Sequence, residues 1–329
     1  MKACVIGAGS WGTAMAVHLA GLGKNVTVWN KFEDEIERIK KAGENEKYLP
    51  GIKIPENVSF TTDMGEATAD AELIIFALPS PLVRTVAKDL SEYVSKGQII
   101  VNLSKGLEKG SLKRLSEVLS EEIPQGRIVV MSGPSHAEEV SRKLPTTNVV
   151  ASADKDAAEF VQDFAMNESF RLYTSEDVVG VELGGALKNV IALCAGMSDG
   201  LGYGDNTKAA LMTRGLEEIK RLGVSMGAEA ETFLGLSGMG DLIVTCTSMH
   251  SRNRRAGILL GKGNALDDVL KEVGMVVEGV NTADAAYELS KKYGVLMPIV
   301  EEANRILFEG KNPRVAVNDL MTREKRAEH

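Results

Sequence analysis

Short apolar runs alternate with helix-like segments along the first half of the chain. Six runs are each short enough for a buried strand: residues 2–7, 25–30, 71–79, 98–104, 127–133 and 148–152. Three segments between them have helical spacing: residues 10–23, 81–95 and 111–122. Uninterrupted apolar strands separated by helices are typical of a parallel sheet covered on both faces. The pattern predicts an α/β domain of the Rossmann type, with a doubly wound, mostly parallel sheet.

The pattern changes near residue 176, after which strand signals are rare. Residues 175–201 form a long apolar run with helical spacing, and the helix is expected to begin at Ser175. Further helical segments follow at residues 206–227, 265–273, 280–293 and 299–309, and the last two are expected to stop at Gly294 and Gly310. We therefore predict a dinucleotide-binding domain over residues 1–177 and an all-α domain, mainly for substrate binding and catalysis, over residues 178–329.

The charge balance excludes one class of partner. The chain has 38 lysines and arginines against 46 acids, a net charge of −8, whereas general nucleic-acid binding needs a basic surface. We expect no nucleic-acid partner. The 4 histidines lack carboxylates at metal-ligand spacing, so we expect no metal site.

The cysteines and the apolar runs bear on the compartment. The 3 cysteines, Cys4, Cys194 and Cys246, are far apart and odd in number, which fits a reducing cytoplasm. No stretch approaches the roughly 18 apolar residues that a membrane helix needs, so no membrane insertion is expected.

A glycine-rich turn joins the first predicted strand to the first predicted helix. Gly7, Gly9 and Gly12 form the pattern G-x-G-x-x-G. Glycines permit the tight turn and the close approach of the backbone, so that a pyrophosphate can bind at the helix N-terminus. The strand before the motif and the helix after it favour a dinucleotide site over a purely structural turn.

The end of the second strand bears on the choice of cofactor. An NAD enzyme usually places an acid there for the ribose 2′-hydroxyl. This chain reads Trp29-Asn30-Lys31, and the first acid is Glu33. Lys31 either pairs with a 2′-phosphate or is solvated near Glu35. We favour NADP(H), with NAD(H) as the alternative.

Polar or tightly turning residues follow three of the predicted strands, at residues 78–81, 103–106 and 132–139. Ligands of open α/β sheets bind at the carboxyl ends of the strands. Lys105 is therefore expected at the ligand edge, although an isolated lysine is more often a solvated surface residue.

Lys188 lies in an otherwise small and apolar run, GGALKNVIALCAG. Its helical neighbours include Gly184 and Gly185, which would let another surface or a ligand approach closely. Asn189 follows with a donor and an acceptor. Since a buried ammonium must be paired, reach water or change its pKa, Lys188 is a candidate acid–base group.

A third polar segment follows at residues 235–257. Asp241 lies among glycines and could compensate an ammonium. The run SRNRR, from Ser251 to Arg255, combines guanidinium groups with neutral donors, a combination that suits phosphate oxygens. The alternative is a solvated basic turn. In an acidic protein with a dinucleotide motif, we favour a phosphate-bearing substrate.

The motifs together resemble those of the bacterial-type NAD(P)-dependent glycerol-3-phosphate dehydrogenase family. They occur in the family's order over nearly the whole chain: GAGSWGTA (7–14), LSKGL (103–107), SGPSHAEE (132–139), ELGGALKNVIALCAG (182–196), GLSGMGDLIVTC (235–246) and SRNRRAG (251–257). The resemblance implies interconversion of dihydroxyacetone phosphate and sn-glycerol 3-phosphate, which supplies phospholipid synthesis.

The resemblance also implies roles for individual residues. Lys188, Lys105 and Asp241 would be catalytic, with Lys188 as the proton donor or acceptor. Substrate contacts would come from the same three residues and from Gly133, Ser135, Asn189, Thr245, Ser251, Arg252 and Asn253. Cofactor contacts would come from Gly7, Gly9, Ser10, Trp11, Gly12, Lys31, Lys105, Ala137, Arg252, Val276 and Glu278. Many relatives carry arginine or histidine where this chain has Asn30 and Lys31.

Two other functions fit parts of the pattern. A dehydrogenase of a β-hydroxyacid or a sugar-acid phosphate could use the SRNRR run to bind a carboxylate. A non-enzymatic sensor of NADPH would not need both Lys188 and Asp241. We expect a small phosphate as the substrate, and a homodimer is the default assembly.

Overall fold

The computed structural model of this chain describes residues 1–325, 327 and 328. Ten strands occur there: β1 (Lys2–Ile6), β2 (Asn25–Trp29), β3 (Glu44–Asn45), β4 (Leu49–Lys53), β5 (Val58–Thr61), β6 (Leu73–Phe76), β7 (Ile99–Asn102), β8 (Arg127–Ser132), β9 (Thr146–Ala151) and β10 (Phe170–Ser175). Every predicted run contains or overlaps a strand. The short strands β3, β4 and β5 and the edge strand β10 were not predicted.

Eight strands form one twisted sheet in the order β10-β9-β8-β7-β6-β1-β2-β5. Neighbours run parallel except β8 and β9, which are antiparallel. All four residues of β6 and of β7 are buried, because helices cover both faces of the sheet. The mostly parallel α/β fold is therefore confirmed.

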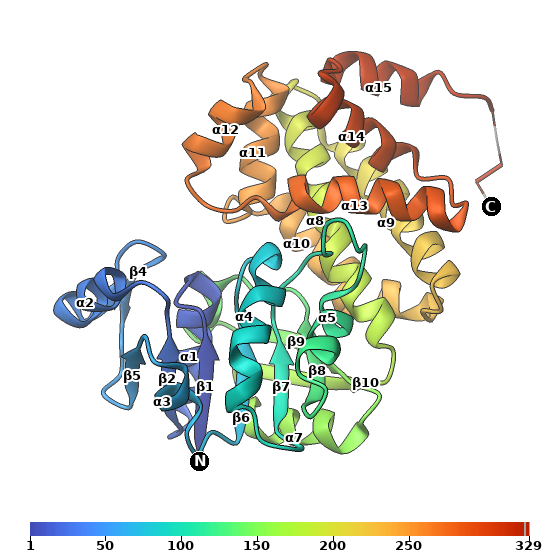
Figure 1. The fold of residues 1–329 in the computed structure, drawn as a ribbon. Coiled ribbons are helices and arrows are strands. Elements are labelled where there is room, and N and C mark those ends of the chain that lie inside the picture. The colour runs from blue at the N-terminus through green and yellow to red at the C-terminus, as the bar shows by residue number, and fades with distance from the viewer. Residues whose placement is uncertain (326, 329) are drawn as a thin grey trace.

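Fifteen α-helices occur among the described residues. Those of the first half are α1 (Ser10–Gly21), α2 (Glu33–Ala42), α3 (Met64–Thr68), α4 (Val83–Leu90), α5 (Leu115–Glu122), α6 (Ala137–Val140) and α7 (Lys155–Ala165). Those of the second half are α8 (Val178–Gly200), α9 (Asp205–Ser225), α10 (Asp241–Thr247), α11 (Arg252–Gly261), α12 (Leu266–Val273), α13 (Glu278–Tyr293), α14 (Pro298–Glu309) and α15 (Pro313–Met321). The second group gathers beyond one end of the sheet (Figure 1).

Several predicted helix ends agree with the structure, and one does not. Gly294 and Gly310 end α13 and α14 in the left-handed conformation, with φ of 65° and 71°. The predicted start of α8 at Ser175 is wrong. The helix begins at Val178, because the Asp177 carboxylate accepts a hydrogen bond of 2.8 Å from the Gly180 amide and so caps it.

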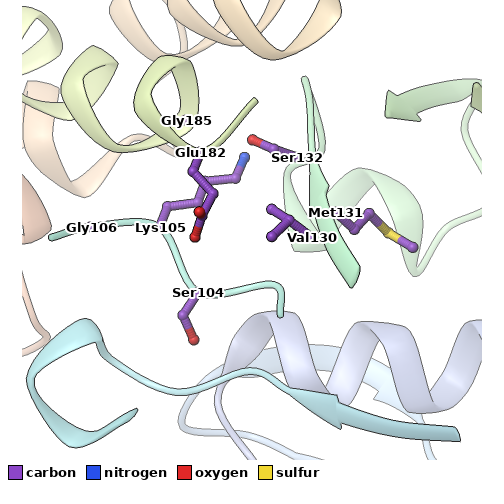
Figure 2. A pocket seen from close by; sticks show the side chains of 8 residues that line it. All are labelled: Ser104, Lys105, Gly106, Val130, Met131, Ser132, Glu182 and Gly185. Carbon is purple, nitrogen blue, oxygen red and sulfur yellow. The ribbon is translucent and has the colours of Figure 1, made fainter. Parts of the chain in front are cut away.

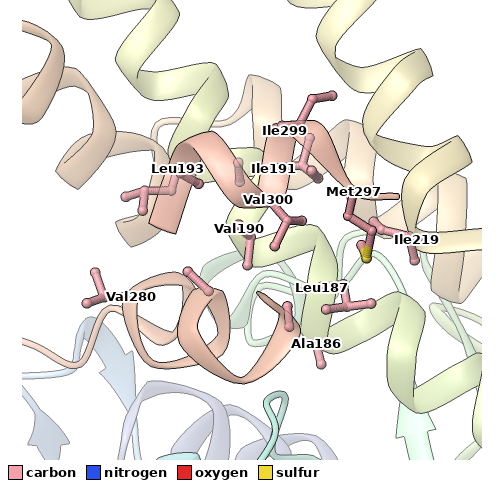
Figure 3. Close-up of a cluster of buried hydrophobic side chains, with 14 of the residues drawn as sticks. Ala186, Leu187, Val190, Ile191, Leu193, Ile219, Val280, Met297, Ile299 and Val300 are labelled. Atoms are coloured by element: carbon pink, nitrogen blue, oxygen red, sulfur yellow. The ribbon is translucent and has the colours of Figure 1, made fainter. Parts of the chain in front are cut away.

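The helix α8 is the core of the helical half. Its apolar side chains pack against α9, α13 and α14, for example Leu187 and Ile191 near Ile219 and Val300 (Figure 3). By length and a mean hydropathy of 1.6 it is apolar enough to cross a membrane, contrary to our expectation. However, 89% of that apolar window is buried inside the protein, as expected of a core helix.

The helix α8 also contacts strands β8 and β9, so it connects the two halves physically. β10 ends at Ser175, and α8 begins three residues later. The domain boundary after residue 177 stays a prediction, since one helix packs on both sides of it.

Candidate active site

A cavity of about 890 Å³ lies between the carboxyl ends of the strands and the helical half. The turn after β1 and the loops after β2, β6, β7 and β8 line it from one side. The helices α8 and α10 and the segments that begin α11 and α13 line it from the other. Groups from both halves can therefore act on one bound molecule.

The glycine turn has the shape that a dinucleotide requires. Gly7 has φ of +111°, and the Gly7 amide donates a hydrogen bond of 2.9 Å to the Trp29 carbonyl. A Cβ on Gly12 would lie 2.0 Å from the Gly7 carbonyl oxygen, so only glycine permits this packing of turn on helix. A Cβ on Gly9 would meet no atom within 4 Å, because Gly9 faces the cavity. A pyrophosphate at the start of α1 fits this turn.

A buried asparagine braces the turn from outside the motif. The Asn45 side-chain amide donates hydrogen bonds of 2.9 Å both to the Ala8 carbonyl and to the Thr13 hydroxyl. Asn45 lies in β3, which no sequence pattern indicated. The turn therefore depends on a contact that the motif alone does not reveal.

The residues after β2 form the outer end of the cavity. Asn30, Phe32, Glu35 and Tyr48 line it, whereas Lys31 is exposed and is not among the lining residues. The sequence analysis names Glu35 only as a partner for a solvated Lys31 and does not predict that it lines the cavity. Its position in the first turn of α2, next to the buried Ile36, could have indicated this.

A cluster of opposite charges lies deep in the cavity. The Lys188 ammonium donates hydrogen bonds of 2.6 Å to Asp241 Oδ1 and to the Thr245 hydroxyl. The Lys105 ammonium donates to Asp241 Oδ2 at 2.5 Å and to the Gly133 carbonyl at 3.0 Å. One carboxylate therefore holds two ammonium groups that come from opposite sides of the cavity.

Burial decides the ionisation of this cluster. Lys188 is 6% exposed, and desolvation lowers the pKa of its ammonium to about 8, with Lys105 acting in the same sense and Asp241 in the opposite one. Asp241 is 2% exposed, and burial disfavours its charge. The ammonium groups of Lys105 and Lys188 outweigh that burial and hold the pKa of Asp241 below its ordinary value.

Small residues on α8 make this arrangement possible. A Cβ on Gly184 would lie 2.6 Å from the Ser237 carbonyl oxygen, in the π-helical turn Leu236–Gly240 before α10. A Cβ on Gly185 would lie 2.4 Å from the Ser132 hydroxyl at the end of β8. The glycines beside Lys188 therefore let both the Asp241 segment and the sheet approach the helix.

Lys105 passes beneath α8 on its way to Asp241. Figure 2 shows its side chain among Ser132, Glu182 and Gly185, around a cavity of about 10 Å³. That volume is about enough for one water molecule. The Lys105 stem is thus enclosed by β8 and α8, which fixes the direction of its ammonium.

The basic run divides between two faces of α11. Ser251 and Arg252 line the cavity, and so does Arg255. Arg254 turns away and forms ion pairs of 2.8 Å with Asp199. Burial lowers the pKa of the Arg252 guanidinium. Two guanidinium groups thus face the cavity, where an anion would compensate them.

Asn253 connects three helices as well as lining the cavity. Its side-chain amide donates a hydrogen bond of 2.9 Å to Asn189 Oδ1 of α8. Its Oδ1 accepts a hydrogen bond of 2.8 Å from the Gly279 amide of α13. The start of α13 also reaches the sheet, because Glu278 accepts hydrogen bonds from the Ser80 amide at 2.9 Å and from the Ser80 hydroxyl at 2.6 Å. Burial raises the pKa of Glu278.

The structure brings most of the expected site residues to the one cavity. Fifteen of them line it: Gly7, Gly9, Ser10, Trp11, Lys105, Ser135, Ala137, Lys188, Asn189, Thr245, Ser251, Arg252, Asn253, Val276 and Glu278. Gly12, Gly133 and Asp241 lie behind the lining and support it through the contacts above. Lys31 is the one expected residue that the structure leaves outside, on the exposed surface.

His136 is a lining residue that the sequence analysis missed. Its Nε2 is buried, and no described residue forms a hydrogen bond with it. Burial lowers the pKa of its imidazole, and the Lys188 ammonium acts in the same sense. It immediately follows Ser135 in the motif SGPSHAEE, which is the signal that could have found it.

The Rossmann sheet, the glycine turn and the buried lysine cluster define a two-domain, dinucleotide-dependent oxidoreductase. Two family models cover nearly the whole chain. One is described as the NAD-dependent glycerol-3-phosphate dehydrogenase N-terminus and matches residues 2–158. The other is described as the C-terminus of the same enzyme and matches residues 177–318.

Curated relatives and solved structures agree with these matches. A glycerol-3-phosphate dehydrogenase [NAD(P)+] of Thermoanaerobacter sp. (strain X514) is 58% identical over 100% of this chain and 99% of its own length. One from Agathobacter rectalis is 54% identical over 99% of this chain and 97% of its own. The crystal structure of glycerol-3-phosphate dehydrogenase from Coxiella burnetii has a TM-score of 0.95 at 37% identity and covers 98% and 99% of the two chains. This chain belongs to the NAD-dependent glycerol-3-phosphate dehydrogenase family.

Proposed function

We propose that this chain interconverts dihydroxyacetone phosphate and sn-glycerol 3-phosphate with NADP(H) or NAD(H), and that Lys188 is its acid–base group. The observation that carries the proposal is the Lys188 ammonium. It is buried on Asp241 and Thr245 and lies in the same cavity as the glycine turn. Family membership supports the reaction, since the relatives are named for it.

The residues of the cavity suit reduction of a ketone. A reduced nicotinamide dinucleotide, held at the glycine turn, would supply the hydride for the substrate carbonyl carbon. Lys188 donates a proton to the carbonyl oxygen, on which negative charge develops. The Lys105 ammonium, on the other side of Asp241, stabilises that charge. In the reverse direction the neutral Lys188 amine accepts the hydroxyl proton.

The cavity also contains groups suited to hold the substrate phosphate. Ser251 and Arg252 offer a hydroxyl and a guanidinium at the start of α11, where the helix dipole favours an anion. Asn253 fixes that helix to α8 and α13. Binding the phosphate there would orient the carbonyl relative to Lys188, and positioning of this kind contributes substantially to enzymatic rates.

The proposal extends to the setting of the enzyme. We propose a cytoplasmic enzyme that supplies glycerol 3-phosphate to phospholipid synthesis and acts as a homodimer. The three unpaired cysteines fit a reducing compartment. A two-fold dimer is the commonest assembly among soluble homo-oligomers.

The test follows NADPH absorbance after addition of dihydroxyacetone phosphate. We expect the wild-type enzyme to oxidise NADPH. In a parallel assay with a 3-hydroxyacid and NADP, we expect little formation of NADPH. Lys188→Ala should lower kcat by at least about 100-fold, with NADPH affinity largely kept. The matched control is Lys220→Ala, which removes a lysine paired with Glu217 at 2.6 Å on α9 and should keep turnover. Near-normal turnover of Lys188→Ala would contradict the assignment.

A further inference from the structure

A half-buried carboxylate lies at the outer end of the cavity, beyond the residues used in the reaction. The Glu35 side chain is 15% exposed and lines the cavity with Asn30 and Tyr48. Its Oε2 accepts a hydrogen bond of 3.0 Å from the Asn30 side-chain amide. Its Oε1 accepts one of 2.7 Å from the Lys47 ammonium and a longer one of 3.4 Å from the Tyr48 hydroxyl. These contacts hold the carboxylate in one place.

The position of this carboxylate relative to the glycine turn indicates what it would meet. Glu35 is in the first turn of α2, which follows β2, and the Gly7 amide is hydrogen-bonded to Trp29, the last residue of β2. In a Rossmann fold the adenosine ribose lies beside this strand end, and an acid here accepts a hydrogen bond from the ribose 2′-hydroxyl. Glu35 therefore has both the place and the chemistry of a group that binds the 2′-hydroxyl.

The same carboxylate would repel the 2′-phosphate of NADP unless a cation accompanied it. Lys47 is that cation. Its ammonium forms an ion pair with Glu35, and its side chain is 53% exposed, so it is free to turn toward a bound phosphate. Lys47 also lies over the Tyr48 ring, at 4.6 Å from its centroid, and so stays at the cavity edge. Lys31, the residue expected to bind the 2′-phosphate, is exposed and outside the lining, as Lys47 is, but it forms no ion pair with Glu35 among the described residues.

We propose that the Glu35–Lys47 pair sets the choice between NAD and NADP in this enzyme. Glu35 accepts the 2′-hydroxyl of NAD. Lys47 neutralises Glu35 and binds the 2′-phosphate of NADP, so that the pocket accepts either nucleotide. The inference rests on the proposed function only in that the bound molecule is a nicotinamide dinucleotide. The specificity is thus determined by a pair of residues, and not by a lone basic residue after β2.

Two substitutions separate the roles of the pair. Glu35→Gln keeps the size and one acceptor but removes the charge, so it should tighten NADPH binding and weaken NADH binding. Lys47→Met keeps the length but removes the ammonium, so it should weaken NADPH binding while NADH binding changes little. Each charge-assisted contact is worth about tenfold in affinity. We therefore expect the ratio of Kd for NADH to Kd for NADPH to rise about tenfold in Glu35→Gln and to fall about tenfold in Lys47→Met.

The measurement is a direct titration of each nucleotide in the absence of substrate. Quenching of tryptophan fluorescence reports binding, since Trp11 lines the cavity. The matched control is Glu37→Gln with Lys40→Met, which removes a pair of 3.5 Å on the same helix whose members do not line the cavity. The control should leave the ratio unchanged. Low ionic strength is needed because Lys47 is exposed and salt would screen its charge.

A ratio that moves more than about twofold in the stated direction in both variants supports the proposal. A ratio that stays within twofold of the wild type, or moves the opposite way, in either variant overturns it. Because these titrations require no turnover, they give an answer even if dihydroxyacetone phosphate is not reduced. Failure of the proposed reaction and failure of this assignment are therefore distinguishable.

Discussion

The two halves of the molecule contribute to the cavity by different means. Apart from the Lys105 ammonium, the sheet half supplies mainly backbone: the turn at Gly7 and Gly12 leaves room for a ligand and directs a helix N-terminus at it. The helical half supplies charged side chains, of which Lys188 and Asp241 are almost completely buried. Backbone contacts bind many dinucleotides alike, whereas a buried charge needs a specific partner. The difference suggests that affinity for the nucleotide depends mainly on the first half and the chemistry mainly on the second.

The largest effect is expected from the anion that joins the halves. Asp241→Asn leaves the ammonium groups of Lys105 and Lys188 without their carboxylate, so the Lys188 pKa should fall further and the two cations should repel. We expect kcat to fall by on the order of 100-fold, measured by NADPH oxidation, with NADPH affinity little changed.

A second carboxylate provides the matched control for that variant. Asp199 also joins two cations, Lys208 at 2.7 Å and Arg254 at 2.8 Å, at the other end of α8. Asp199→Asn should lower stability and keep kcat within about fivefold, because it touches no cavity-lining ammonium. Equal losses of kcat in the two variants would show that the Asp241 effect is merely structural.

A smaller effect is expected from the glycine turn. Gly12→Ala places a Cβ 2.0 Å from the Gly7 carbonyl oxygen, so the turn must shift away from the start of α1. We expect a loss of about 1–3 kcal/mol in the free energy of unfolding, together with weaker NADPH binding. Gly21→Ala, in the same helix, meets no atom within 4 Å and should cost nothing in either measurement. If Gly12→Ala leaves the affinity for NADPH unchanged, the glycine turn does not contribute to nucleotide binding.

The smallest effect on the reaction concerns a buried carboxyl group in the helical half that does not line the cavity. Glu218 is 2% exposed and accepts hydrogen bonds from the amides of Ile299 and Val300 at the start of α14. Burial raises its pKa to about 7. The folded state therefore keeps a proton that the unfolded state releases, and stability falls as pH rises from about 4.5 to about 7.

Glu218→Gln keeps an acceptor for those amides and removes the titration. Its unfolding free energy relative to wild type should therefore be higher at pH 8 than at pH 5, by about 2–3 kcal/mol. Urea unfolding at the two pH values measures this. If the stability of the variant relative to wild type is the same at both pH values, folding does not raise the pKa of Glu218.

The sequence predicted the local features well and the contacts between distant segments poorly. The six central strands, the glycine turn and the long helix around Lys188 follow from periodicity over short windows. The contacts of Asn45 and of Glu35 depend on how β3 and α2 fold back on the glycine turn. These contacts join segments too far apart in the sequence for periodicity over a short window to predict them. His136 carries no periodic signal, because it lies in a loop, so only its place beside Ser135 in the motif SGPSHAEE could have indicated it.

The direction of the Lys188 pKa was likewise beyond the sequence. Desolvation and Lys105 lower it and Asp241 raises it, and only the degree of burial decides among them. The motif could place the lysine on a helix among small residues. It could not show that Gly184 and Gly185 bring two other segments so close that water is almost excluded.

The most direct test of the central claim is the pH dependence of kcat/KM in both directions of the reaction. With a Lys188 pKa of about 8, reduction of dihydroxyacetone phosphate needs the ammonium and should decline above that pH, approaching tenfold per pH unit. Oxidation of glycerol 3-phosphate needs the neutral amine and should rise with pH and level off above about 8. Opposite profiles with a common midpoint support Lys188 as the acid–base group. Profiles that are flat from about pH 7 to 9.5, or that change in the same sense in both directions, would contradict it.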